Sequence, residues 1–476
     1  MKRFRVTFKP QDVTVSVDEH TTLLQAQIDA GLRPDAPCGG KGTCGKCTVT
    51  VDGQQVLACQ TAVDRDMTVY TEEETSVRIL TDGLKAQVQP DGEDDYVLAV
   101  DIGTTTVVAY LLDGHTGALL AQSSAMNPQS QYGADVISRI QHALHGGGDE
   151  LSGCIRATLR QLAADAAKKA GIDPDAIGHA AIVGNTAMHH LLLGIDPRPL
   201  VTPPYMPAVS EALEREKARI LPNIAGFVGG DTVGCLVATR FDQLDELTLL
   251  IDIGTNGEMV LGDKHRRIAC STAAGPAFEG AKISCGMRGA PGAVDHVTVE
   301  NGELRAHVID DQPSEGLCGS GLLDLVAALL DIGVIDESGR MAGKKYDLCD
   351  NVTLTQKDVR EVQLAKAAIR AGIELLAQQL GVQVEEIKQV YLAGAFGNYL
   401  NPASACRIGM IPPVLEKRIV PIGNAAGTGA RLCALSREMF DYSCRLAKNT
   451  EFLELASLPQ FQDCYVDALE FSEEEL

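Results

Sequence analysis

The stretches VLAVDIGTTT (Val97–Thr106) and LLIDIGTNG (Leu249–Gly257) decide the fold of the larger part of this chain. Each is an apolar run that reaches an Asp-x-Gly-Thr turn and is followed by a second apolar run. The pattern predicts a buried strand, a tight turn and an outgoing strand. Because the two copies lie far apart in the sequence, they indicate two similar subdomains and not a stack of short repeats.

The chemistry of such a turn suits a phosphate group. Gly and Thr at a tight bend direct successive N–H and hydroxyl groups into one concavity, and an Asp at its start can hold Mg²⁺ through water. One copy is typical of an ordinary hairpin, whereas two facing copies can hold ATP with Mg²⁺ from both sides. The turn residues expected to bind the nucleotide are Gly103, Thr104, Thr105, Thr106, Gly254, Thr255 and Asn256.

Three carboxylates are the catalytic candidates. Asp101 and Asp252 begin the two turns, and Glu258 lies on the strand that leaves the second turn. A carboxylate in the position of Glu258 is suited to orienting the attacking water. A surface carboxylate without a catalytic role is the alternative interpretation.

Paired turns of this kind resemble those of the ATPase superfamily of actin, sugar kinases and heat-shock chaperones. The resemblance implies an α/β ATPase of two subdomains with a ribonuclease-H-like (actin-like) fold, with phosphate motifs at 98–113 and 249–263. It also implies that GAFG, at Gly394–Gly397, is the adenosine motif. Separately, the sequence LCGSG at Leu317–Gly321 opens an apolar helix whose N-terminus either meets an anion or only packs.

These segments add further candidates for nucleotide binding. The individual residues are Gly319, Ser320, Gly321, Gly394, Ala395, Phe396 and Gly397. Two other backbone-rich segments that the nucleotide can touch are GPAFEG (Gly275–Gly280) and GNAAGTG (Gly423–Gly429).

A group of four cysteines near the N-terminus comprises Cys38, Cys44, Cys47 and Cys59. Four thiolates are what a [2Fe–2S] cluster needs, and four neighbouring glycines let the backbone wrap closely and point N–H groups at the sulfides. Zinc is one alternative, but zinc sites usually show two CxxC-like pairs and only one is present here. A disulfide knot is the other. The cysteine spacing resembles that of adrenodoxin-like ferredoxins.

The same loop also matches two nucleotide-binding patterns. Gly40–Gly45 fits GxGxxG, and Gly40–Lys46 nearly fits a P-loop, with Cys47 where Ser or Thr is needed for Mg²⁺. Neither pattern follows a strand and opens a helix, because the continuation KCTVTV is typical of a strand. We therefore reject both.

Residues 1–78 are predicted to form the ferredoxin module, an α+β domain of the β-grasp type. Residues 4–8 and 13–17 alternate between apolar and polar and predict a hairpin. Thr21 or Thr22 can cap a following helix, which Gly31 is expected to end. The turn dipeptide at residues 52–53 predicts the end of a strand.

The rest of the chain is expected to contain a linker and two ATPase subdomains. Residues 79–95 are polar and predict the linker, with a long surface loop as the alternative. Subdomain I is assigned to 96–246, with amphipathic helices at about 135–145 and 151–170. Subdomain II is assigned to 247–476, with a C-terminal return to subdomain I.

Composition limits the partners of the protein. The 476 residues carry a formal net charge of −23, contain no Trp and are only 4% aromatic, which disfavours nucleic acid and anionic membranes. The N-terminal residues show no secretory signal, and no apolar run is long enough to span a membrane. Four of the fourteen cysteines cluster and the others are scattered, as in a reducing compartment. We expect a cytoplasmic protein.

An electron carrier joined to an ATPase suggests uphill electron transfer, because downhill transfer needs no ATP. For one electron, each unfavourable gap of about 59 mV costs about 1.4 kcal/mol. An acceptor about 200 mV below the cluster then requires about 5 kcal/mol, which a nucleotide-driven change in binding can supply.

The whole chain resembles the reductive activators of corrinoid proteins, which are ferredoxin–ATPase fusions. The motifs that carry the resemblance are CGGKGTCGKC, Asn127–Ile140, Val183–Gly194, GPAFEGA and Ala393–Pro402. The resemblance implies one-electron reduction of inactive cob(II)amide to cob(I)amide in a methyltransferase system. It implies a corrinoid protein and an electron donor protein as partners, and a homodimer is one assembly to consider. Some members insert a further domain where this chain has only residues 79–95.

Other function classes stay open at this point. One is an ATP-driven electron activator of dehydratases or reductases, whose relatives bridge a dimer with a four-iron cluster. Another is a redox-sensing binding module with a degenerate nucleotide domain, which the intact Asp101, Asp252 and Gly394 disfavour. A sugar or acetate kinase fits less well, because phosphorylation has no use for the four clustered cysteines.

Overall fold

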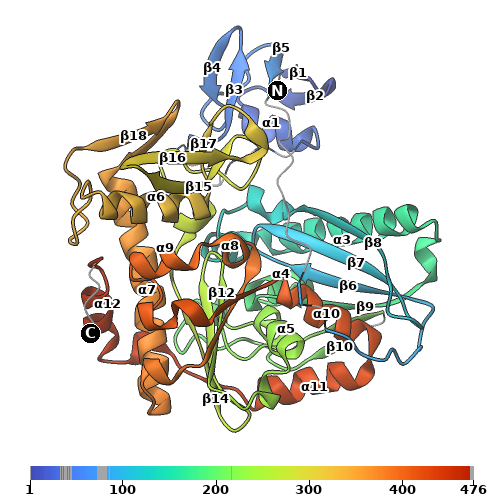
Figure 1. Ribbon diagram of the computed structural model, residues 1–476. Coiled ribbons are helices and arrows are strands. Elements are labelled where there is room, and N and C mark those ends of the chain that lie inside the picture. Colours follow the sequence, from blue (N-terminus) through green and yellow to red (C-terminus); the bar gives the residue numbers. More distant parts are fainter. Residues whose placement is uncertain are drawn as a thin grey trace.

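The computed structural model describes residues 2–32, 34, 36, 40, 42, 45–71, 83–84, 86–215 and 217–471. At the N-terminal end, a five-stranded sheet in the order β2-β1-β5-β3-β4 packs against one helix and projects from the larger body (Figure 1). Its elements are β1 (Arg3–Lys9), β2 (Val13–Asp18), α1 (Leu23–Asp29), β3 (Thr48–Val51), β4 (Gln54–Leu57) and β5 (Met67–Tyr70).

Local predictions for this module are confirmed. The β1–β2 hairpin pairs Val6 with Val15, and the Thr22 side chain accepts from the Gln25 amide to cap α1. Gly31 follows the helix with a φ of +76°, the left-handed conformation that favours glycine after a helix. Asp52 and Gly53 both have positive φ in the turn between β3 and β4.

The larger body contains two six-stranded sheets with the same core order. In each, an antiparallel meander of three strands is joined on one side by two successive parallel strands. The first sheet has β6 (Tyr96–Ile102), β7 (Thr106–Asp113), β8 (Leu119–Met126), β9 (Ile177–Gly184), β10 (Leu213–Arg215) and β11 (Ala218–Ile220). The second has β12 (Thr248–Ile253), β13 (Gly257–Gly262), β14 (Arg267–Thr272), β20 (Gln389–Ala393), β21 (Ile419–Gly423) and β22 (Glu451–Phe452). The repeated turn therefore marks a repeated sheet.

Helices separate and cover the two sheets. Between the sheets, apolar residues of both pack against α5 (Gly230–Thr239), α10 (Ala425–Leu435) and α11 (Arg437–Lys448). The outer face of the first sheet is covered by α2 (Val136–His142), α3 (Gly148–Ala170) and α4 (Thr186–Leu193). That of the second is covered mainly by α6 (Gly319–Asp331) and α7 (Gln356–Leu380). The chain thus returns to the first sheet near its C-terminus.

The remaining elements surround the second sheet. They are β15 (Ala293–Glu300), β16 (Glu303–Val308), β17 (Gly316–Leu317), β18 (Lys345–Cys349), β19 (Val352–Thr355), α8 (Gly394–Tyr399), α9 (Pro402–Arg407) and α12 (Phe461–Asp467). The expected helix at 151–170 begins three residues early, at Gly148, after a π-helical turn. It ends at Ala170, and Gly171 follows it with a φ of +71°. The ferredoxin module lies beside the part of this region near β17 (Figure 1), where Lys46 Nζ donates to Gly286 O.

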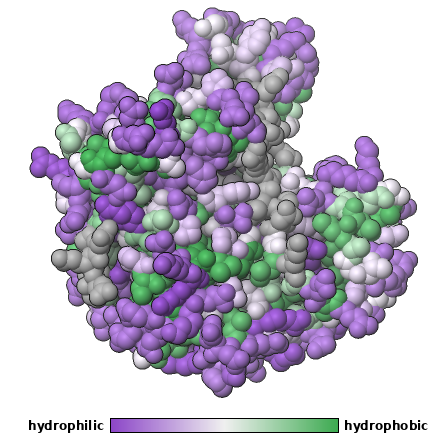
Figure 2. Space-filling view, in the orientation of Figure 1, coloured by the Kyte–Doolittle hydropathy of each residue, from purple (hydrophilic) through white to green (hydrophobic). Residues whose placement is uncertain are grey.

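The visible face of the molecule is mostly polar. Figure 2 shows a mostly hydrophilic face with scattered apolar patches. None of the helices in the described residues has the length and hydropathy needed to cross a bilayer.

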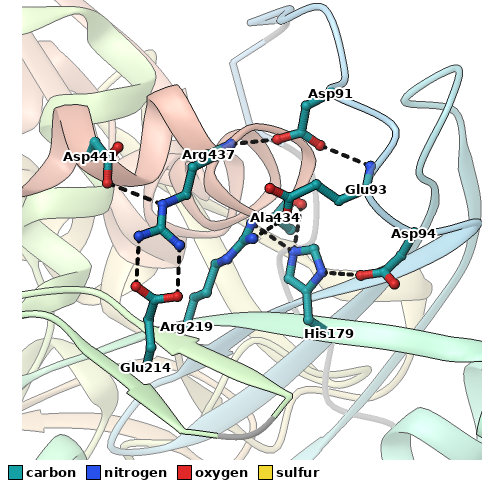
Figure 3. Close-up of polar contacts among 9 residues, drawn as sticks. All are labelled: Asp91, Glu93, Asp94, His179, Glu214, Arg219, Ala434, Arg437 and Asp441. Carbon is teal, nitrogen blue, oxygen red and sulfur yellow. Dashed lines mark hydrogen bonds and ion pairs between the residues drawn. The ribbon is translucent and has the colours of Figure 1, made fainter.

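Part of the expected linker is held against the larger body (Figure 3). Asp91 Oδ2 accepts from the Arg437 amide at 2.7 Å, at the start of α11. Glu93 pairs with Arg219 of β11, and Asp94 Oδ2 lies 2.7 Å from His179 Nδ1 of β9. Residues 86–95 are therefore bound along the first sheet and the C-terminal helices. Residues 79–82 and 85 lie outside the described residues.

Candidate functional site

The two Asp-x-Gly-Thr turns adopt similar bends at equivalent ends of the two sheets. The Gly103 amide donates to Thr106 O at 2.9 Å, and the Gly254 amide donates to Asn256 O at 2.8 Å. Asp101 and Asp252 are the penultimate residues of β6 and β12. Both turns therefore present backbone and hydroxyl groups just beyond a buried strand, as the sequence predicts.

Glu279 connects the two turns. Its Oε2 accepts from Thr105 Oγ1 at 3.4 Å and from Thr255 Oγ1 at 3.1 Å. Burial raises the pKa of this carboxyl, and the Thr255 hydrogen bond partly opposes that shift. The structure thus brings predicted residues of both turns to one carboxylate oxygen.

Four carboxylates gather beside the turns. Burial raises the pKa of Asp101 and of Asp252 to about 6. The pKa of Asp231 is raised to about 7, mainly by burial and secondly by the charge of the nearby Asp252. Glu258 is 9% exposed, and burial followed by the charges of Asp231 and Asp252 raises its pKa well above its ordinary value. The surface interpretation of Glu258 is therefore wrong.

The sheet register explains the position of Glu258. Asp252 and Glu258 are direct partners across the antiparallel β12–β13 pair. Directly opposed residues point to the same face of a sheet, so the two carboxylates share one face. This concentration of buried negative charge suits a cation.

Asp231 was not predicted from the sequence, and Asn185 and Asn424 were predicted only as members of the segments Val183–Gly194 and Gly423–Gly429. Asp231 begins α5, and its carboxylate accepts from the Thr232 amide. Asn424 Nδ2 donates to Asp101 Oδ2 at 2.9 Å, while its Oδ1 accepts from the Gly427 amide at 2.7 Å as the cap of α10. Asn185 Nδ2 donates to Thr104 Oγ1 at 3.0 Å. A polar residue at a helix start was the available signal for all three.

The predicted adenosine motif and the predicted helix start lie together. The rings of Phe396 and Phe278 stack with centroids 4.8 Å apart and planes 6° apart. A Cβ at Gly319 would lie 2.0 Å from Phe278 O and 2.9 Å from Phe396 Cδ2. Gly394, with a φ of +80°, approaches the second turn so closely that a Cβ there would lie 2.6 Å from Asp252 Oδ1. Only glycine fits at these two contacts.

In the cysteine loop, the described residues fit a cluster site in part. Cys47 and Cys59 are buried, and the Ala58 amide donates to Cys47 O at 2.8 Å. Gly40 and Gly42 have φ values of +80° and +73°, and a Cβ at Gly40 would lie 3.9 Å from the Cβ of Cys59. Backbone without side chains therefore approaches the cysteines closely. The other two predicted ligands, Cys38 and Cys44, lie outside the described residues.

In the described part of the chain, no three His, Cys, Asp or Glu side chains are arranged to hold a metal ion directly. The carboxylates beside the turns still fit a Mg²⁺ ion held through water, because they carry charge in a buried place. Asp101 and Asp252 are the residues that would hold it.

Three family models match most of the chain. Residues 6–68 match the 2Fe-2S iron-sulfur cluster binding domain, 96–244 match the RACo middle region, and 246–476 match the C-terminal domain of RACo, the ASKHA domain. The chain is thus a ferredoxin domain of α+β class followed by an actin-like α/β ATPase domain.

Two curated relatives and one solved structure are similar over most of their length. The corrinoid activation enzyme RamQ of Eubacterium limosum is 30% identical over 97% of this chain and 98% of its own. The [Co(II) methylated amine-specific corrinoid protein] reductase of Methanosarcina barkeri is 27% identical over 79% and 77%. The structure of a reductive activator for corrinoid, iron-sulfur protein has 30% identity and a TM-score of 0.70, covering 98% of both chains. The chain therefore belongs to the family of reductive activators of corrinoid proteins.

Proposed function

We propose that this protein uses ATP to reduce a corrinoid protein of a methyltransferase system by one electron, from inactive cob(II)amide to cob(I)amide. The observation that carries the proposal is that a family relative matches both the cysteine loop and the paired turns over 97% of the chain. A separate electron donor protein is proposed to reduce the ferredoxin module first.

Each part of the site has a proposed role. Cys38, Cys44, Cys47 and Cys59 hold a [2Fe–2S] cluster, which supplies single electrons. Thr105, Thr255 and the amides of both turns bind the phosphates of ATP. Asp101 and Asp252 hold Mg²⁺ through water.

Two further groups complete the nucleotide site. Glu258, buried beside Asp252, accepts a proton from the attacking water and orients it. The stacked Phe278 and Phe396 mark where the adenosine is proposed to lie, beside Gly319 and Gly394.

An anaerobic absorbance assay tests the proposal. A cob(II)amide protein of a methyltransferase system is mixed with the reduced holoprotein, with or without Mg-ATP, and formation of the cob(I)amide band is followed. The band is expected only with ATP, and Cys47→Ser and Asp252→Asn should each abolish it. Cys464→Ser, a half-buried cysteine of α12, and Asp441→Asn, an exposed residue of α11, are the matched controls. ATP hydrolysis without cob(I)amide across several corrinoid proteins would refute corrinoid reduction and favour a dehydratase or reductase partner.

A further inference from the structure

The Glu279 carboxylate occupies the place where phosphate is proposed to bind. A single oxygen accepts the hydroxyls of Thr105, from the first sheet, and Thr255, from the second. Phosphate oxygens that bind the same hydroxyls would compete with this carboxylate, and the two negative charges would repel each other. Nucleotide binding and the Glu279 bridge therefore exclude one another.

The segment that follows Glu279 is closely packed. A Cβ at Gly286 would lie 2.1 Å from Gly280 O, and one at Gly280 would lie 2.6 Å from Met287 O. The Met287 amide donates to Leu317 O, and the Leu317 amide donates to Cys285 O, both at 2.8 Å. With its two ends held this tightly together, the segment 279–287 has little freedom to deform, so a shift at one end is passed to the other.

The far end of this segment contacts the ferredoxin module. Lys46 Nζ donates to Gly286 O at 2.6 Å. Lys46 directly precedes Cys47, one of the proposed cluster ligands. The segment is therefore linked to both phosphate turns at Glu279 and to the cysteine loop at Gly286. In Figure 1 the module sits above β16 and β17.

From these contacts we infer that Glu279 is a positioning residue that reports nucleotide binding to the ferredoxin module. Through its carboxylate Glu279 holds the two turns together, and through Lys46 the Gly286 carbonyl holds residues 45–47. When ATP phosphates take the Thr105 and Thr255 hydroxyls, Glu279 leaves, the segment shifts, and the Lys46 contact is released. ATP then releases residues 45–47, which include the proposed ligand Cys47, so that the proposed cluster can meet the electron acceptor. This inference rests on the proposed ATP site.

Hydrogen–deuterium exchange on the full-length holoprotein tests the coupling. The nucleotide is the non-hydrolysable analogue AMPPNP with Mg²⁺, and its binding is measured separately with a fluorescent ATP analogue. In the unchanged protein, AMPPNP should raise the exchange rate of amides at 45–47 and 280–287 at least severalfold. Glu279→Gln keeps a hydrogen-bond acceptor but removes the charge that the phosphates repel, so this variant should bind nucleotide while its response at 45–47 is reduced.

Two variants separate coupling from simple loss of structure. Lys46→Met, at an exposed position, should give fast exchange at 45–47 with or without AMPPNP, while 280–287 still responds. Lys282 lies on the segment 279–287, and its Nζ is 3.9 Å from Glu361 Oε2. Glu361→Gln removes this ion pair and should behave as the unchanged protein. Nucleotide binding with no change at 45–47, or an unaltered response in Glu279→Gln, would overturn the coupling alone. Absence of any nucleotide binding would overturn the proposed function together with it.

Discussion

At the scale of single residues, the buried carboxylates beside the turns oppose folding when they are ionised. The pKa of Asp252 is about 6, above its ordinary 3.8, so the folded state binds more protons than the unfolded state between those values. Stability is therefore gained as the pH falls through this window, and the ionised carboxylate weakens the fold above pH 6.

We therefore expect Asp252→Asn to raise the free energy of unfolding of the nucleotide-free protein at pH 8, by about 1 kcal/mol or more, while ATP hydrolysis is lost. Urea unfolding and phosphate release measure the two effects. Asp441→Asn, at an exposed position of α11, is the control and should change neither. A destabilised Asp252→Asn would show that the carboxylate has a structural role instead.

A second buried charge lies far from the nucleotide turns. Lys366 of α7 donates to Glu470 O and lies 5.2 Å from the centre of the Phe471 ring. Burial lowers its pKa from 10.5 to about 7, so the unfolded state binds more protons between these values. Stability should rise with pH from about 7 to about 10 and should be lost as the pH falls towards 7.

The variant Lys366→Met should remove this rise, because it removes the titrating group. Urea unfolding at pH 7 and pH 9.5 provides the comparison. Lys345→Met, at an exposed site on β18, serves as the control and should retain the rise. An undiminished slope in Lys366→Met would assign the pH dependence to another group.

At the scale of elements, the residue that caps helix α10 also contacts the candidate nucleotide site. Asn424 caps the helix through Gly427 and also donates to Asp101. Asn424→Ala should cost about 1 kcal/mol of stability, the usual cost of losing a cap, and should weaken ATP binding about tenfold by removing the partner of Asp101.

The matched control for Asn424 is Asn401→Ala. Asn401 caps α9 by accepting from the Ala403 amide at 3.1 Å, as Asn424 caps α10. It should lower stability to a similar degree and leave the affinity for ATP unchanged. Equal losses of affinity in the two variants would mean that the Asp101 contact has no part in binding.

At the scale of the whole molecule, the contacts in Figure 3 hold residues 91–94, which precede β6, against the larger body. The Arg219 side chain is 10% exposed and meets Glu93 and His179. The Arg437 side chain is 43% exposed and pairs with Glu214 at 2.7 Å. Buried polar partners lose more than exposed pairs when one member is removed.

Arg219→Met should therefore lower the free energy of unfolding by about 1–3 kcal/mol, and should make residues 86–95 more sensitive to protease. Arg437→Met should cost less than about 1 kcal/mol. Urea unfolding and limited proteolysis distinguish the two variants. If both cost the same, the buried Arg219 cluster is not what anchors this segment.

Much of the local structure was predictable from particular residues. Three features depend only on neighbours a few residues away, which can be seen in the sequence. They are the Asp-x-Gly-Thr turns between apolar runs, the cap at Thr22 and the glycine after α3. Asn424 was not predictable in its role, because its partner Asp101 is 323 residues away. Glu258 was predictable as a candidate but not in its surroundings, because only the pairing register of β12 and β13 places it beside Asp252.

By itself, the amino-acid sequence determined the two repeated turns, the cysteine loop and the family to which the chain belongs. These features depend on residue types at short spacing, because turns and loops are formed by backbone interactions between residues close in the sequence. Only the tertiary structure decided that Glu279 joins both turns, that Asn424 holds Asp101 and that Gly286 meets Lys46. Such contacts bring together residues from separate sheets and modules, and their partners are chosen by packing of the whole chain.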